Sequence, residues 1–183
     1  MGKKTTIAKL AAACFALVPA SSHAEAPAPL QSYPSTLPAG RTLFNVASRL
    51  GILNLVSAYA LALDNSDAEA WFRLFAGDAV FVDGTGGGPP VALSGTELRK
   101  HWADRIEALN KAGVKQRHLL SNIVLLEETP KTAHISAVGL LATTRDGKAF
   151  KAVAALNDEA WLVNVNGEWK IARWNDFADS PVE

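Results

Sequence analysis

The strongest constraint on the fold is a change of pattern near Gly113, because the chain before it has mostly helical patterns and the chain after it mostly extended ones. After this point, segments rich in β-branched and apolar residues span 115–127, 132–144, 150–164 and 169–177. Two of the breaks between them contain Asp-Gly at 146–147 and Asn-Gly at 166–167, which are strong signals for tight hairpins. This order predicts an α+β domain in which helices cover one face of a curved antiparallel sheet.

The first half of the chain is predicted to contain three helices. Apolar residues recur at three- or four-residue steps through 46–63, and a short helix is expected over 68–74. Ser94 and Glu97 have the spacing of a capping box and predict a third helix that ends at Gly113. A strand is expected over 79–83, and the glycines and prolines of 84–90 predict a loop. Seven side chains are expected to lie between helices and sheet: Leu50, Leu53, Val56, Phe75, Trp102, Ile106 and Trp169.

The N-terminal residues have the pattern of a secretory signal peptide. Lys3 and Lys4 precede a short apolar run, and Ser22-His23-Ala24 places small residues at the two positions read by signal peptidase. We therefore expect a signal peptide over 1–24, a proline-rich flexible leader over 25–41 and one domain over 42–183. The expected location is periplasmic or secreted, without a stable membrane anchor.

Composition argues against several other kinds of site. Cys14 is the only cysteine and lies in the expected signal peptide, so the mature chain would have no thiol for a disulfide, a nucleophile or a metal. The formal net charge is zero and no basic stripe is present, which argues against nucleic-acid binding. His101 and His134 lack metal-ligand spacing, and the glycines of 84–88 lack the Lys-Ser/Thr of a phosphate loop. No metal or cofactor is predicted.

Four segments resemble the SnoaL-like branch of the nuclear transport factor 2-like superfamily. They are 59–64 (YALALD), 71–81 (WFRLFAGDAVF), 117–122 (RHLLSN) and 167–173 (GEWKIAR), and their order matches that family over about 45–178. The resemblance implies a cone with an apolar interior, often in a homodimer. Relatives include scytalone dehydratase, bile-acid dehydratase, ketosteroid isomerase and the small subunits of ring-hydroxylating dioxygenases.

The resemblance also implies candidate site residues. The dehydratase members pair an Asp with a His inside the cone, and the matching positions are Asp64 and His118. The bile-acid dehydratase pattern adds a Tyr and an Arg, for which Tyr59 and Arg173 are the nearest residues. Tyr59 would assist catalysis by hydrogen bonding, and Arg173 would bind a substrate carboxylate. Asn122 is expected to share the strand face of His118 and to assist by hydrogen bonding. Trp71, Trp102, Trp161 and Trp174 are candidates to line a substrate pocket.

Each candidate also has a structural alternative. His118 could be a core histidine bonded to the backbone, or an exposed one, and Asn122 could satisfy a neighbouring backbone group. Asp64 could stabilise a turn, Tyr59 and the tryptophans could be core aromatics, and Arg173 could form a salt bridge at a sheet edge. If Asp64 and His118 form the Asp-His dyad of the family, the predicted function is that of a cofactor-independent lyase, of dehydratase type, or of an isomerase. Its substrate would be a small, mostly apolar molecule. The alternative is a non-catalytic periplasmic protein that binds a small ligand or acts as a scaffold.

A homodimer formed through the outer face of the sheet is expected, because neither face of 132–144 or 150–163 is plainly polar.

Overall fold

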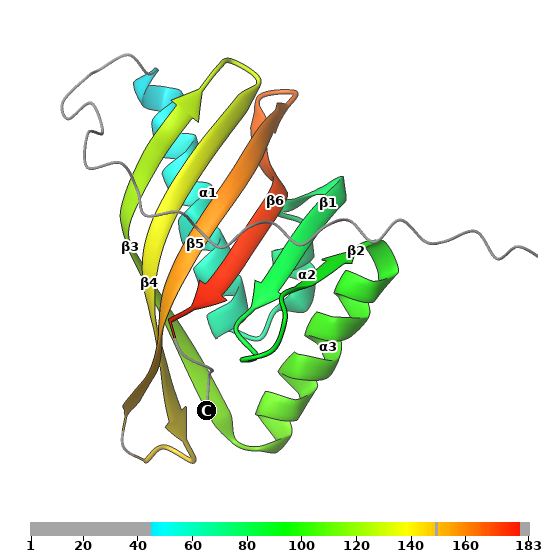
Figure 1. Ribbon diagram of the computed structural model, residues 1–183, viewed down its shortest axis with the longest axis vertical. Helices are drawn as coiled ribbons and strands as arrows, with labels where there is room; N and C mark the ends of the chain where they lie inside the picture. Colours follow the sequence, from blue (N-terminus) through cyan, green and yellow to red (C-terminus); the bar gives the residue numbers. More distant parts are fainter. Residues whose placement is uncertain (1–44, 149, 180–183) are drawn as a thin grey trace, which may run out of the picture.

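The structure is a computed structural model that describes residues 45–148 and 150–179. The predicted signal peptide, over 1–24, and the whole of the predicted leader, over 25–41, therefore lie outside the described residues. Figure 1 shows an α+β arrangement in which one sheet is flanked by helices. The elements run in the order α1 (Val46–Asp64), α2 (Ala68–Phe72), β1 (Phe75–Gly84), β2 (Val91–Ser94), α3 (Gly95–Lys111), β3 (Val114–Glu128), β4 (Thr132–Arg145), β5 (Lys151–Val165) and β6 (Glu168–Ala178).

The helices begin where polar side chains satisfy free backbone N–H groups, with one exception. Asn45 accepts a hydrogen bond from the Ala47 N–H at the start of α1, and Asp67 accepts one from the Ala70 N–H at the start of α2. The capping box predicted at the start of α3 does not form, because the Ser94 side chain makes no capping hydrogen bond. The chain turns into α3 through Gly95, which has a φ of 50°.

The sheet has six strands in the order β2-β1-β6-β5-β4-β3 and is not closed. The hairpin-linked strands β3 to β6 pair antiparallel, as predicted. Strand β1, however, pairs in parallel with β6, the last strand of the chain. This long-range pairing inserts β1 and the unpredicted short strand β2 at one edge of the sheet.

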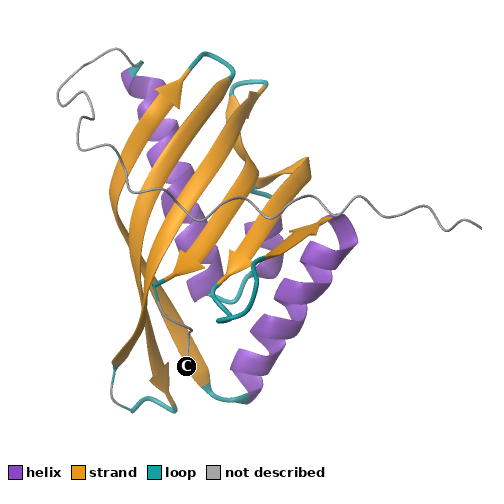
Figure 2. Ribbon diagram, in the orientation of Figure 1, coloured by secondary structure: helices purple, strands orange, loops and turns teal. Residues whose placement is uncertain are grey.

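Helix α1 lies along one face of the sheet, which we call the inner face (Figure 2). By length and composition α1 could cross a membrane, but here it packs against β3 and β6. The core between helices and sheet is rich in aromatic rings, and its fully buried members include Trp71, Phe81 and Trp174. Of the predicted core residues, Val56, Trp102 and Trp169 are buried, whereas Leu53, Phe75 and Ile106 are partly buried.

Leu50 was predicted to be buried, and this prediction is wrong: the residue is 56% exposed. Helix α1 is apolar on nearly all sides, so periodicity alone could not tell which of its apolar residues face the sheet. Leu61 on the same helix is also exposed.

Candidate active site

The end of α1 and the middle of β3 bring Asp64 and His118 into contact. The Oδ1 atom of Asp64 lies 2.8 Å from the Nδ1 atom of His118 and accepts a second hydrogen bond, of 2.9 Å, from the backbone N–H of His118. Both side chains are largely buried, with exposed fractions of 12% for Asp64 and 8% for His118. A carboxylate held in this way fixes Nδ1 as the protonated ring nitrogen and leaves the Nε2 lone pair free.

The local sequence explains why Asp64 is available for this contact. It is the last residue of α1, and the neighbouring Asp67, rather than Asp64, caps α2. Arg117, which precedes His118 in β3, donates from Nη1 to the backbone oxygen of Asp64 at 3.1 Å. The end of α1 is therefore joined to β3 through the side chain of Asp64 and through its backbone oxygen. Asp67, and not Asp64, has the local hydrogen-bonding role in the turn that was the structural alternative for Asp64.

An open cleft of about 430 Å³ adjoins the pair, between α1 and β3. Apart from Asp64, His118 and Ser57, its lining is apolar: Val56, Ala60, Leu61, Leu119, Leu120 and Ile123. Within the described part of the chain, no hydrogen-bond partner contacts Nε2 of His118. The site thus combines a histidine with a free ring nitrogen and a cleft whose volume falls within the usual range for small-molecule sites.

Tyr59 is a core residue that lies against the aromatic cluster. Its ring stacks on Trp174 with centroids 4.0 Å apart and also contacts Trp71 at 5.7 Å. Burial, and then the negative charges of Asp176 and Asp158, raise the pKa of the Tyr59 hydroxyl well above its usual value. The side chain is therefore neutral and packs in the interior, as the structural alternative proposed.

Trp71 and Trp102 also pack in the core. Their ring centroids are 4.9 Å apart, and both rings contact Phe81. Neither lines the cleft beside His118. The expectation that they line the substrate pocket at the dyad is therefore corrected to a packing role.

Asn122 does not lie beside His118. Asn122 and Ile123 together oppose a single residue of β4, which is a β-bulge, and Asn122 has a φ of 49°. The bulge shifts the alternation of the strand, so Ile123 packs inward and Asn122 is exposed. The prediction that Asn122 shares the face of His118 is wrong, because strict alternation was assumed through a strand that contains an extra residue.

Trp161 and Arg173 lie on the face of the sheet away from α1, which we call the outer face. They are register partners on β5 and β6, and their strand neighbours Ala160, Leu162 and Trp174 point into the core. The Arg173 guanidinium lies 5.7 Å from the centre of the Trp161 ring. Both predicted substrate-binding roles are thus corrected, because the sheet separates these residues from the dyad.

Sequence reasoning missed two buried carboxyl groups on the inner face. Asp158 is 2% exposed and Asp176 is 8% exposed, and they are register partners across β5 and β6. The signal was present in β5, where Asp158 lies at every-second-residue spacing with the apolar residues Leu156, Ala160 and Leu162 and therefore shares their strand face. Among the described residues, no group of three or more His, Cys, Asp or Glu side chains is placed to hold a metal ion.

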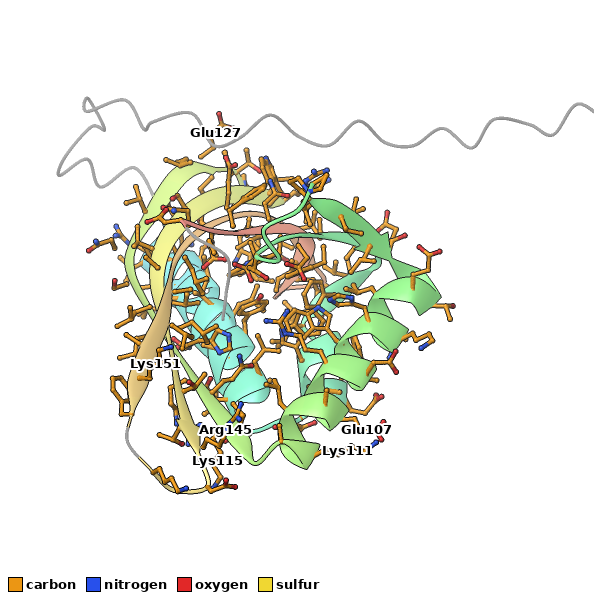
Figure 3. All side chains as sticks on the ribbon, turned by 60° about the horizontal axis from the view of Figure 1, so that its bottom comes forward. Glu107, Lys111, Lys115, Glu127, Arg145 and Lys151 are labelled. Atoms are coloured by element: carbon orange, nitrogen blue, oxygen red, sulfur yellow. The ribbon has the colours of Figure 1, made fainter. Side chains whose placement is uncertain are left out.

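Figure 3 places other charged side chains at the rim of the fold. Lys111 at the end of α3, Lys115 at the start of β3 and Arg145 at the end of β4 lie together at one end of the molecule. Lys111 and Lys115 are exposed, so water screens their charges from the interior.

Comparison with known proteins identifies the fold and the family. A candidate scytalone dehydratase from Novosphingobium aromaticivorans is 21% identical, with a TM-score of 0.59 over 73% of this chain and 85% of that one. A candidate aromatic-ring hydroxylase from the same organism is 22% identical, with a TM-score of 0.62 over 76% and 94%. The β subunit of a candidate aromatic-ring-hydroxylating dioxygenase, also from that organism, is 22% identical, with a TM-score of 0.59 over 73% and 90%. No curated protein matched the sequence. The profile of the SnoaL-like domain matches residues 45–175, and the chain belongs to this family.

Proposed function

We propose that the protein is a cofactor-independent lyase, of dehydratase type, or an isomerase that uses His118 as a general base oriented by Asp64. The observation that carries the proposal is the 2.8 Å contact between Asp64 Oδ1 and His118 Nδ1 beside the cleft. The family assignment and the scytalone dehydratase-like fold support a small-molecule dehydratase or isomerase.

In this mechanism His118 Nε2 removes a proton from a carbon atom of the substrate. Asp64 stabilises the imidazolium that forms and keeps the ring in the required tautomer. In an elimination, the electron pair of the broken C–H bond forms a C=C bond, and the leaving group departs with the electron pair of its bond to carbon. The proton on Nε2 then passes to the departing hydroxide, which leaves as water, or to solvent. In an isomerisation, Nε2 returns a proton to a different carbon atom, and exchange of the imidazolium proton with solvent before this step carries deuterium into the product.

The lining of the cleft supports a small and mostly apolar substrate. Val56, Ala60, Leu120 and Ile123 offer hydrocarbon surface next to the dyad. Burial of apolar ligand surface contributes about 25 cal/mol per Å². Asp64 is the acidic residue in this lining and it is already bonded to His118, so an uncharged ligand suits the cleft best.

A binding screen followed by hydrogen exchange tests the proposal. Uncharged hydroxylated and keto compounds would be screened by native mass spectrometry, and bound compounds incubated with the protein in D₂O. We expect uptake of deuterium at carbon, or elimination, with wild type. His118→Gln should lower the rate about 10²–10⁴-fold, the usual contribution of a general base, and Asp64→Asn should also lower it.

His134 provides a matched control. Its Nε2 atom lies 2.7 Å from Glu159 Oε1, so His134→Gln removes a second His–carboxylate pair that lies away from the cleft. This variant should keep the wild-type rate. A bound compound could exchange at the same rate with wild type and His118→Gln, or exchange with neither protein. Either outcome would contradict the catalytic proposal and favour the non-catalytic binding protein.

Export and dimerisation complete the proposal. The signal pattern over 1–24 supports a periplasmic or secreted location, which N-terminal sequencing of exported protein would test. A homodimer through the outer face is supported by two exposed apolar residues that share a face of β4, Val138 and Leu140. Sedimentation that gives a monomer at all concentrations would contradict the dimer.

A further inference from the structure

Ser57 is the polar side chain of the cleft lining that the proposed mechanism does not use. It is an exposed residue of α1 and precedes Asp64 by seven positions. Seven residues make almost two full turns of an α-helix, so both side chains project from the same face of α1, with their Cα atoms about 10 Å apart. The cleft therefore offers a second polar group roughly two helical turns away from the dyad.

The hydroxyl group of Ser57 already uses its proton. Its Oγ atom donates to the backbone oxygen of Leu53, one turn earlier in α1, at 2.9 Å. A serine hydroxyl has one proton and two acceptor lone pairs, so Ser57 can offer only an acceptor to a ligand in the cleft. An O–H or N–H group of the ligand can fill this acceptor, whereas a carbonyl or ether oxygen cannot.

The cleft between the two polar groups is apolar. Ala60 and Leu61 occupy the intervening turn of α1, and Leu119 lines the cleft from β3. Ala60 is buried, whereas Leu61 and Leu119 are 60% and 52% exposed. Large apolar side chains left exposed around a concave surface are typical of a ligand-binding site. A ligand with an apolar middle would cover both leucines and would need no hydrogen bond in this stretch.

We propose that Ser57 determines substrate specificity by accepting a hydrogen bond from a hydroxyl or N–H group at the end of the substrate remote from the reacting carbon. This inference rests on the proposed function, in which His118 removes a proton from that carbon. It narrows the substrate class to uncharged molecules that have an apolar middle and a hydrogen-bond donor at one end. Ser57 binds and orients this donor, and it transfers no proton in the reaction.

Binding of matched phenols and methyl ethers tests the inference without catalysis. Phenol, 2-naphthol and 4-phenylphenol would each be compared with the corresponding O-methyl ether by amide NMR titration of the full chain at pH 7. Shifts of the Leu61 and His118 amide signals would show that a probe occupies this cleft. At least one phenol should bind wild type about 2- to 10-fold more tightly than its ether, which is the usual range for one neutral hydrogen bond.

Three variants assign this preference to Ser57. Ser57→Ala should abolish it and leave the affinity for the ethers unchanged, and alanine at an exposed helical position should preserve the fold. Ser57→Thr keeps a hydroxyl group and should retain the preference. Ser121→Ala is the matched control, because Ser121 Oγ also donates to a backbone oxygen, that of Val138 at 3.3 Å, but lies outside the cleft lining. This control should behave as wild type.

Two results would overturn the inference. One is that no phenol binds the cleft of wild type more tightly than its ether, including the case in which none of the probes binds; this comparison needs no variant. The other is a preference that persists unchanged in Ser57→Ala. His118→Gln should keep the preference, because it leaves Ser57 in place. A failed exchange assay with an intact preference would therefore refute the catalytic proposal and leave Ser57 as a binding residue.

Discussion

Replacing Asp158 by Asn should change how the stability of the protein depends on pH. The Asn side chain keeps an oxygen that can accept the 2.8 Å hydrogen bond from Trp174 Nε1. Its amide group replaces the unpartnered Oδ2 and can donate toward Asp176. The substitution therefore preserves shape and hydrogen bonding while removing one titrating group from the interior.

The sign of the effect follows from the pKa of Asp158, which burial raises from 3.8 to about 7 in the folded protein. Between these values the folded state holds more protons than the unfolded state, so the free energy of unfolding falls as pH rises. Each pKa unit corresponds to about 1.4 kcal/mol, which gives wild type a loss of about 4 kcal/mol across this window. Asp158→Asn does not suffer this loss. It should match wild type in stability near pH 4 and exceed it at pH 8.

Urea unfolding followed by far-UV circular dichroism at pH 4.5, 6, 7 and 8 would measure this difference. Circular dichroism is preferable to tryptophan fluorescence, because Trp174 lies against the mutated residue. A gap between variant and wild type that widens with pH is the expected result. A gap that is constant across all four pH values would refute the reasoning, since it would show that Asp158 titrates equally in both states.

Three further changes test the packing and the electrostatics. Trp174→Phe removes the donor to Asp158, so carboxyl NMR should show a further rise in the pKa of Asp158; a fall would contradict the role of that hydrogen bond. Gly84→Ala should destabilise the fold by about 1–3 kcal/mol in urea, because its Cβ would lie 2.2 Å from the Phe177 ring; unchanged stability would show that the ring moves freely. Leu162→Ala removes a side chain that is 1% exposed and should cost about 2–5 kcal/mol in the same assay, and a loss below 1 kcal/mol would place it outside the rigid core.

Local sequence patterns were sufficient for the order of the elements. The Asp-Gly and Asn-Gly turns at 146–147 and 166–167 join β4 to β5 and β5 to β6, as expected from turn chemistry that depends on a few neighbouring residues. The resemblance to the SnoaL-like family, now confirmed, pointed to Asp64 and His118. These residues lie far apart in the chain, and their contact was inferred from the family rather than from local pattern.

Tertiary structure alone decided which side chains share a site. The parallel pairing of β1 with β6 joins distant segments and has no local signal. The bulge at Asn122 adds one residue, and since side chains alternate with a period of two, that residue reversed the predicted face. Trp161 and Arg173 were placed on the wrong side of the sheet because an aromatic or cationic residue type does not specify a face.

The pairing of Asp158 with Asp176 shows most clearly why these features of the site could not be predicted from the sequence. Each residue is an ordinary aspartate in the sequence, and its protonation depends on burial and on charges contributed by other elements. Interactions between residues that are close together in the chain depend on a few neighbouring residue types, so they could be predicted from the sequence. Burial and electrostatics depend on every element that surrounds a group, so they exist only once the chain has folded.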